Sequence, residues 1–204
     1  DGIIQTYGAD ALRVFILFAS PPEKEFAWMQ EGVEGCHRFL SRVWTLFHEN
    51  RDLFDAKDAP KPLDAAAAGR YPLARKAHQT IRKVGDDIGT RFHLNTAVSS
   101  IMELYNQTKR ERDALRSDAA GRAVLKHAIE SLVLVLGPFA PHLAEELWRR
   151  MGRDGLLCRA AWPAYDPELA RDEMMTIIVQ VNGKLRDKFE AAPGTEEDAL
   201  VKGA

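Results

Sequence analysis

The sequence contains only two cysteines, Cys36 and Cys158, and they lie far apart. Two cysteines without a CxxC spacing are too few for a disulfide scaffold or a cysteine-based zinc site, and their scarcity fits a reducing compartment. The six histidines never form an HxxxH pair, so we predict no metal site. The P-loop, GxGxxG and GxSxG motifs are missing too, which excludes the common phosphate-binding and serine-hydrolase signatures.

Long apolar runs and a strong charge of one sign are also missing. The longest apolar run, around residues 132–136, is far shorter than the roughly 18 residues of a membrane span. No basic-then-apolar signal segment opens the chain. The net charge is −2, so any contact with nucleic acid must come from local basic patches. We expect a cytoplasmic monomer without membrane contact.

The sequence does contain the periodicity of amphipathic helices. Apolar residues recur at steps of three and four, and the stretch from Ser131 to Leu136 is apolar nearly all round, which predicts the central helix of a bundle. Asn95 is predicted to cap or open a helix, and Asp118 to lie in the first turn of another. Residues 55–69 lack periodicity and predict a surface linker. The predicted helices span residues 9–20, about 30–53, about 72–91, from about 95, from about 117 to 136, and 142–151.

The period changes near residue 172. A β-branched run from Thr176 to Val181, the turn pair Asn182-Gly183 and the return from Lys184 to Glu190 predict a β-hairpin. We therefore predict a mainly α fold, an antiparallel helical bundle followed by the truncated start of a small α+β domain. The predicted domains are residues 1–29 leading into the bundle, 30–172 forming it, and 173–204 starting the second domain. A start at Asp1 and a new helical pattern from Thr195 predict a piece of a longer polypeptide.

The paired carboxylates do not form a catalytic pair in this prediction. Asp86-Asp87 and Glu145-Glu146 are adjacent on helices, and adjacent side chains point in different directions. We expect no catalytic residue in this chain.

Arginines at helical spacing are the candidate binding residues. Arg38 and Arg42 lie four residues apart, opposite the apolar stripe of their helix, where two guanidinium groups can grip phosphates. Glu34, four residues before Arg38, offers an ordinary ion-pair ladder instead, and the pattern alone favours that alternative. Arg75 and Arg82 lie seven residues apart on the polar side of the next long helix and form a second pair of this kind.

Other cations have a simpler explanation. Lys109, Arg110 and Arg112 lie at a predicted helix end, where the helix dipole accounts for positive charge without any ligand.

Several segments resemble one enzyme family. Tyr7-Gly-Ala-Asp-Ala-Leu-Arg13 resembles the helix that follows the KMSKS loop in class I aminoacyl-tRNA synthetases. Residues 137–148, GPFAPHLAEELW, resemble a segment of their anticodon-binding-type helical domain. Three further stretches narrow the resemblance to bacterial-type leucyl-tRNA synthetases. They are residues 18–22 (FASPP), 32–44 (GVEG followed by RFLSRVW) and 179–186 (VQVNGKLR).

This resemblance implies a function for the parent polypeptide. Members attach leucine to its tRNA in two ATP-driven steps, so ATP and magnesium are implied for the full-length enzyme, and no cofactor is expected in this part. The catalytic and editing domains would lie upstream, residues 1–29 would end the stem-contact region, and the bundle would hold leucine tRNA. The resemblance places Arg38 and Arg42 on the tRNA-facing side. It makes Lys184 and Arg186 weaker candidates, beside Arg75 and Arg82. An isoleucyl or valyl synthetase bundle and a helical protein–protein interaction module remain the alternatives.

Overall fold

The computed structural model describes residues 2–20, 28–55, 57, 59–62, 64–171, 175–181 and 184–191. Contacts between residues divide the chain into two units, Asp1–Ala170 and Arg171–Ala204. The first unit is helical and the second contains a hairpin, and each is considered by itself.

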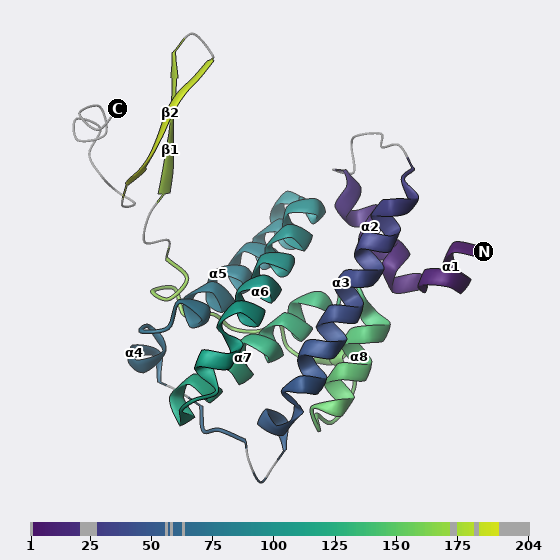
Figure 1. The fold of residues 1–204 in the computed structure, drawn as a ribbon, viewed down its shortest axis with the longest axis vertical. Coiled ribbons are helices and arrows are strands. Elements are labelled where there is room, and N and C mark those ends of the chain that lie inside the picture. Colours follow the sequence, from purple (N-terminus) through teal and green to yellow (C-terminus); the bar gives the residue numbers. More distant parts are fainter. Residues whose placement is uncertain are drawn as a thin grey trace. The chain divides into compact units, whose positions relative to one another are not determined.

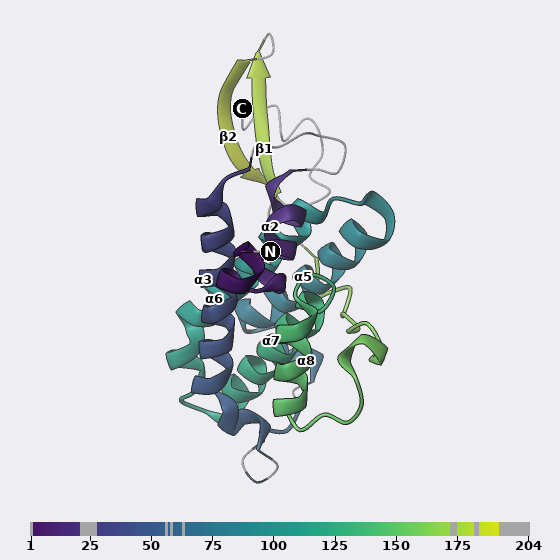
Figure 2. The same ribbon diagram turned by 90° about the vertical axis from the view of Figure 1, so that its right-hand side faces the viewer.

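The first unit is a bundle of long helices with short ones at its edges (Figure 1). Helices α5, α6 and α7 pack on one another, α2 packs on α3 and α6, and α8 contacts α7, α3 and α2. Figure 2 shows the long helices side by side from a second direction. The mainly helical bundle predicted above is confirmed. The elements of this unit are α1 Gly2–Tyr7, α2 Ala9–Ala19, α3 Gln30–Glu49, η1 Arg51–Phe54, α4 Ala65–Ala68, α5 Pro72–Asp86, η2 Asp87–Arg91, α6 Leu94–Leu115, α7 Ala119–Leu136, α8 Pro141–Arg150 and η3 Leu157–Arg159.

Helix α7 carries the centre of the core. Leu125, Ile129, Leu132 and Leu136 are almost completely buried, and the helix contacts α5, α6 and α8. A helix with so wide an apolar surface is stable only where other helices cover it, and the C-terminal part of α7 is accordingly buried among them.

The predicted helix from 30 to 53 is broken near its end by a buried side chain. Asn50 is fully buried, donates from Nδ2 to the carbonyl oxygen of Leu46 (2.7 Å), and accepts from Arg116 Nη1 through Oδ1 (2.8 Å). Helix α3 therefore ends at Glu49, and a 3-10 turn, η1, follows.

The structure defines three helix termini more closely than the sequence did. Asp118 is the N-cap of α7 and not a first-turn residue, because its carboxylate accepts from the backbone N–H of Gly121 (2.9 Å). Of the two predicted positions for Asn95, the structure supports the second: the N-cap is His93, and Asn95 lies in the opening turn of α6. The predicted helix from 72 to 91 changes to a π-helical turn, η2, after Asp86.

The second unit contains the predicted hairpin. Strand β1 (Met175–Val181) pairs antiparallel with β2 (Lys184–Ala191), with Ile177 opposite Phe189 and a register irregularity between Val179 and Gln180. The turn pair Asn182-Gly183 and the helical pattern from Thr195 lie outside the described residues. The α+β domain that this hairpin would begin stays a prediction.

None of the described helices combines the length and the apolar character that a membrane crossing requires. Within the described ranges, no three residues among the histidines, cysteines, aspartates and glutamates come together as a metal-binding group.

Candidate nucleic-acid interface

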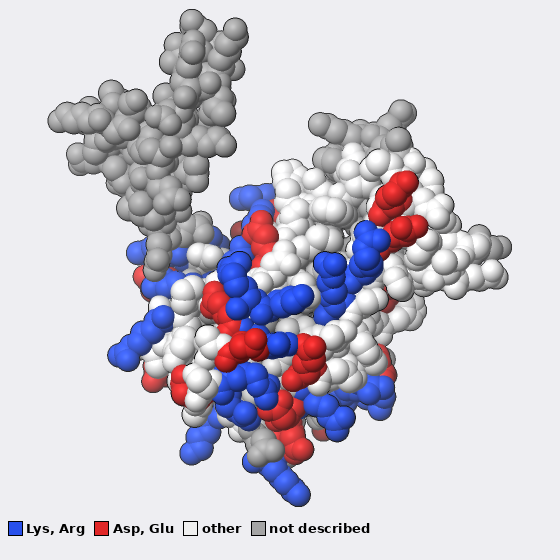
Figure 3. Space-filling model, in the orientation of Figure 1, with Lys and Arg blue, Asp and Glu red and all other residues white. Residues whose placement is uncertain are grey.

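Helix α3 has one buried face and one exposed face. Its buried face is formed by Val33, Cys36, Phe39, Leu40, Val43, Leu46 and Phe47. Arg38, Ser41, Arg42 and Thr45 lie on the exposed face, and the hydroxyls of Ser41 and Thr45 donate to backbone carbonyls one turn earlier. Figure 3 shows basic side chains on the surface over α3, followed by acidic side chains toward its N-terminal end. Arg38 and Arg42 form a basic ridge on the exposed face of α3. Their guanidinium groups, unlike the hydroxyls of Ser41 and Thr45, are available to a ligand.

Neither of these two arginines is held tightly by a carboxylate. The side chain of Arg38 is 60% exposed, and its one ion pair, to Glu34, is 3.8 Å long. No carboxylate of the described residues comes within 4.0 Å of Arg42. The ion-pair ladder that the spacing allowed is therefore weak at Arg38 and absent at Arg42 in this part of the chain, because exposed pairs of this length contribute little.

Several other arginines of the bundle are engaged with acids. Glu146 accepts from Arg149 (2.9 Å) and Arg150 (2.6 Å), and these two arginines hold the pKa of its carboxyl well below the usual range, at about 2. Asp52 pairs with Arg116 (2.9 Å) and lies 3.4 Å from Arg122. Arg38 and Arg42 differ from these paired arginines, as do the exposed Arg91 and Arg110, which likewise have no ion pair to a described residue.

The Arg42 end of the ridge lies close to α6. Burial raises the pKa of the Tyr105 hydroxyl, and the positive charge of Arg42 acts in the opposite direction. The Tyr105 ring packs edge-on against Phe39, with 5.7 Å between centroids. Lys109 follows Tyr105 by one turn of α6 and is exposed, with no ion pair to a described residue. Lys109 therefore extends the basic surface from α3 onto α6, which sequence spacing could not show because the two helices meet only in the fold.

Arg75 and Arg82 lie on α5 and are partly buried. Arg75 donates from Nε to the carbonyl oxygen of Gly69 (3.2 Å), which ties the start of α5 to the preceding turn. Both side chains are less exposed than Arg38 and Arg42. Lys184 and Arg186 lie on β2 in the second unit, and their side chains fall outside what the structure describes.

The two motif segments that resemble synthetases meet at one carboxylate. Asp10 in α2 lies 2.9 Å from Arg13 and 2.8 Å from His142 Nδ1, and it accepts from the backbone N–H of Leu143 (2.8 Å). Leu143 is in the first turn of α8, so Asp10 caps a helix that begins 131 positions after it, since Pro141 is the first residue of α8. Tyr7 donates to Glu34 of α3 (2.9 Å), so the same segment also contacts the ridge helix.

The close approach of α2 and α3 requires a glycine. A Cβ atom on Gly32 would overlap the ring of Phe15, which lies on the facing side of α2. Gly32 therefore allows the close packing of α3 on α2, which carries Asp10 and Phe15.

Known proteins show the same combination of segments. Residues 73–201 match the family model described as the anticodon-binding domain of tRNA ligase. A leucine--tRNA ligase of Geotalea daltonii is 49% identical over 208 residues, covering 100% of this chain and 24% of that relative. One of Thermotoga petrophila is 40% identical over 202 residues, covering 99% of this chain and 24% of that relative. The chain spans about a quarter of the length of these curated relatives.

Solved structures agree with the fold. A ternary complex of LeuRS, tRNA and LeuAMS from Agrobacterium radiobacter K84 matches with a TM-score of 0.73 and 28% identity, covering 99% of this chain and 26% of that chain. The free methionyl-tRNA synthetase of Mycobacterium tuberculosis matches with a TM-score of 0.57 and 16% identity, over 74% of this chain and 34% of that chain. At that identity the second match supports the fold alone.

Proposed function

The chain belongs to the family of anticodon-binding domains of tRNA ligases, and from that premise we propose that it is the tRNA-positioning part of a leucine–tRNA ligase. The observation that carries the proposal is the ridge on α3. Both arginines are exposed, Arg38 has one long ion pair, and Arg42 has none with a described residue. The full-length relatives named above are leucine--tRNA ligases, which supports leucine tRNA as the partner.

The proposed mechanism works through binding energy. Guanidinium groups bind phosphate oxygens through two parallel hydrogen bonds, which fixes the orientation of an RNA backbone without reading its sequence. Holding a tRNA in one orientation places its acceptor end in an active site elsewhere in the polypeptide, and the entropic cost of orientation is then met before the chemical step. The ATP-dependent chemistry, with its magnesium, would belong to the rest of the parent enzyme, and we expect this part alone to be inactive.

The ridge is tested in the full-length enzyme with Arg38→Ala, Arg42→Ala and the double variant. We expect weaker tRNA binding, and a slope of log affinity against log salt reduced by about 1 for each lost phosphate contact. Leucine-dependent ATP–pyrophosphate exchange should stay nearly unchanged, because it needs no tRNA. Arg149→Ala is the matched control, since Arg149 is equally a surface arginine but is paired with Glu146.

Two results would contradict this proposal. If the exchange reaction falls together with aminoacylation, the arginines support folding or catalysis and not tRNA placement. If the double variant binds tRNA with the salt slope of the parent, the ridge makes no phosphate contact. Competition with isoleucine and valine tRNAs in the same titration separates the leucyl enzyme from its sister synthetases, and a protein–protein module would bind none of them.

The remaining candidates extend the same proposal. Arg75, Arg82, Lys184 and Arg186 would add weaker contacts, and single alanine variants rank them by their change in salt slope. The stem-contact role of residues 1–29, the monomeric state and the cytoplasmic location belong to the proposal as well.

A further inference from the structure

Phe92, in the turn between η2 and α6, has an unusual position. Its side chain is 63% exposed, the largest exposed fraction among the big apolar side chains described. Its backbone has φ 54° and ψ 33°, and it is the one non-glycine residue with positive φ in the described part of the chain. This left-handed conformation is costly for a bulky residue, and the exposed ring gains little burial in return.

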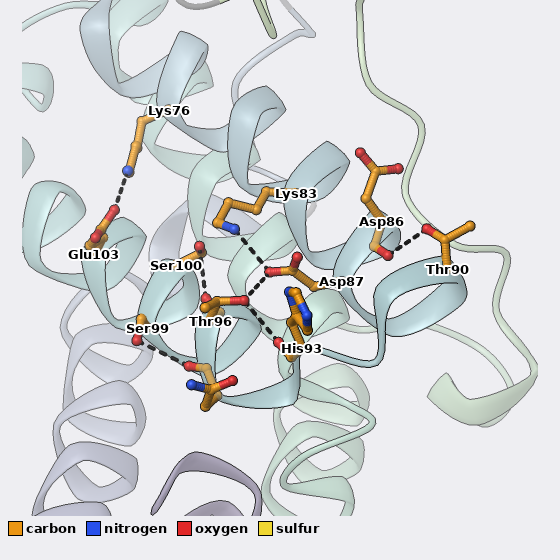
Figure 4. A network of polar contacts seen from close by, with 11 residues as sticks. Lys76, Lys83, Asp86, Asp87, Thr90, His93, Thr96, Ser99, Ser100 and Glu103 are labelled. Carbon is orange, nitrogen blue, oxygen red and sulfur yellow. Dashed lines mark hydrogen bonds and ion pairs between the residues drawn. The ribbon is translucent and has the colours of Figure 1, made fainter. Parts of the chain in front are cut away.

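The turn is held by a buried carboxylate and not by packing of the ring. Asp87 is fully buried, and its Oδ2 accepts from Lys83 Nζ (3.0 Å) and Thr96 Oγ1 (2.6 Å), one group from α5 and one from α6 (Figure 4). Its carbonyl oxygen also accepts from the backbone N–H groups of Phe92 and His93. These contacts hold the backbone on both sides of the turn, so Phe92 stays in its left-handed conformation with its ring exposed to solvent. Strain that the surroundings maintain at an exposed position points to a ligand.

One permanent cation, Arg91, lies next to Phe92 in the chain. Arg91 and His93 flank it, both are exposed, and neither has an ion pair with a described residue. Helix α6 begins beside it without a side-chain cap and without an acidic residue in its first turn. The first helical hydrogen bond runs from Ala97 to His93, so the three N–H groups before Ala97 have no intrahelical acceptor. The buried Asp87 carboxylate approaches this helix start through the Thr96 hydroxyl and is paired with Lys83. Asp86 is exposed at the end of α5, and its carboxylate makes none of the contacts drawn around Asp87 (Figure 4).

We propose that the turn formed by Arg91, Phe92 and His93 is a second RNA contact, in which Phe92 stacks on one unpaired nucleobase. Arg91 and the first N–H groups of α6 bind the phosphate next to that base. An exposed aromatic face beside the Arg91 cation and helix amides matches the two parts of a nucleotide, whereas a protein partner would require a larger apolar surface. The inference rests on the proposed function, because it assigns a further contact to the same tRNA.

The test uses tRNA titrations of the full-length enzyme with two substitutions at one position. Phe92→Leu keeps apolar volume but removes the aromatic face, and we expect about a tenfold loss of affinity, the effect of one lost base–aromatic stack. Phe92→Trp keeps a face for stacking and should bind as tightly as the parent or more tightly. Phe92→Gly relieves the left-handed strain, so its Tm should rise while its affinity falls, which separates a lost contact from a damaged fold.

The possible outcomes distinguish this contact from the ridge on α3. If Arg38→Ala and Arg42→Ala weaken binding while Phe92→Leu does not, the inference about Phe92 is wrong and the proposed function stands. If Phe92→Leu and Phe92→Trp both depress leucine-dependent ATP–pyrophosphate exchange, the ring packs against another part of the polypeptide and the RNA contact is wrong. If neither the arginines nor Phe92 affect tRNA affinity, both the proposed function and this contact fail.

Discussion

The carboxylate of Asp10 joins two helices that are distant in sequence. It accepts a hydrogen bond from the backbone N–H of Leu143 at the start of α8, and it lies within hydrogen-bonding distance of His142 and Arg13. Asp10→Ala leaves that N–H without a partner at a nearly buried position, so we expect the free energy of unfolding to fall by about 2–3 kcal/mol. Urea unfolding of the chain measures the change. Asp113→Ala is the control, because Asp113 is 84% exposed and contacts only Arg112, and its effect should stay within about 0.5 kcal/mol. Equal effects of the two substitutions would show that Asp10 does not act as a cap.

Single residues were predictable where their role depends on near neighbours. The exposure of Arg38 and Arg42 follows from helical spacing alone, because an apolar stripe fixes which face points outward. Their lack of strong acidic partners could not be predicted, because acids such as Glu49 and Asp52 are taken by Arg112 and Arg116 from another helix. The role of Asp10 was missed for the same reason, since its partners are more than 130 positions away.

Helices α5 and α7 meet the segment after α8 at a pair of neutral histidines. The backbone N–H of Asp166 donates to His78 Nδ1 (3.1 Å), and the His78 ring lies 5.0 Å from that of His127. Burial, with a smaller contribution from His127, lowers the pKa of His78 to about 4, and burial lowers the pKa of His127 as well. In the unfolded chain both histidines bind protons near pH 6.5, whereas the folded chain resists protonation. The stability that they contribute is therefore complete above about pH 6.5 and is lost as the pH falls toward 4.

The loss of stability at low pH can be measured with a substitution of His78. Glutamine can still accept a hydrogen bond at this position but does not bind a proton. Between pH 7 and pH 4.5, the free energy of unfolding of His78→Gln should therefore fall by about 1–2 kcal/mol less than that of the parent. This range already allows for the partial exposure of the ring. Thermal unfolding at a series of pH values measures it, and about 1 kcal/mol corresponds to about 2–4 °C for a domain of this size. His93→Gln is the control at an exposed histidine. Parallel pH profiles for the parent and His78→Gln would show that His78 does not carry the effect.

At the level of whole helices, the existence of the long helices followed from periodicity, but their ends depended on tertiary contacts. The predicted helix to residue 53 stops at Glu49 because buried Asn50 accepts a hydrogen bond from Arg116, the C-cap of α6. The predicted helix to residue 91 becomes a π turn where Asp87 is held by Lys83 and Thr96. Both breaks are made by polar side chains that need a partner from a neighbouring helix once they are buried.

Across the whole chain, the change in period near residue 172 coincides with a change in architecture. A helical bundle precedes it and a hairpin follows, because 3.6-residue and two-residue periods cannot share one face of one element. The core residues of the first unit come from positions 11 to 170, so the buried apolar surface that stabilises the bundle lies within that unit. The contact of Phe92 with RNA, by contrast, concerns a residue for which neither periodicity nor composition gave a signal.

The bundle should accordingly fold without the second unit. A variant that ends at Arg171 keeps Leu169 and Ala170, which are 6% and 0% exposed, and we expect one cooperative transition with a Tm within about 2 °C of the full chain. A variant that ends at Pro163 is the matched comparison. It loses both buried side chains and the hydrogen bond from Asp166 to His78, so its free energy of unfolding should fall by about 3 kcal/mol or more. Calorimetry of the two truncated variants and the full chain measures both changes. If the variant ending at Arg171 unfolds as early as the one ending at Pro163, residues beyond 171 stabilise the bundle, and the division into two units does not describe how the chain folds.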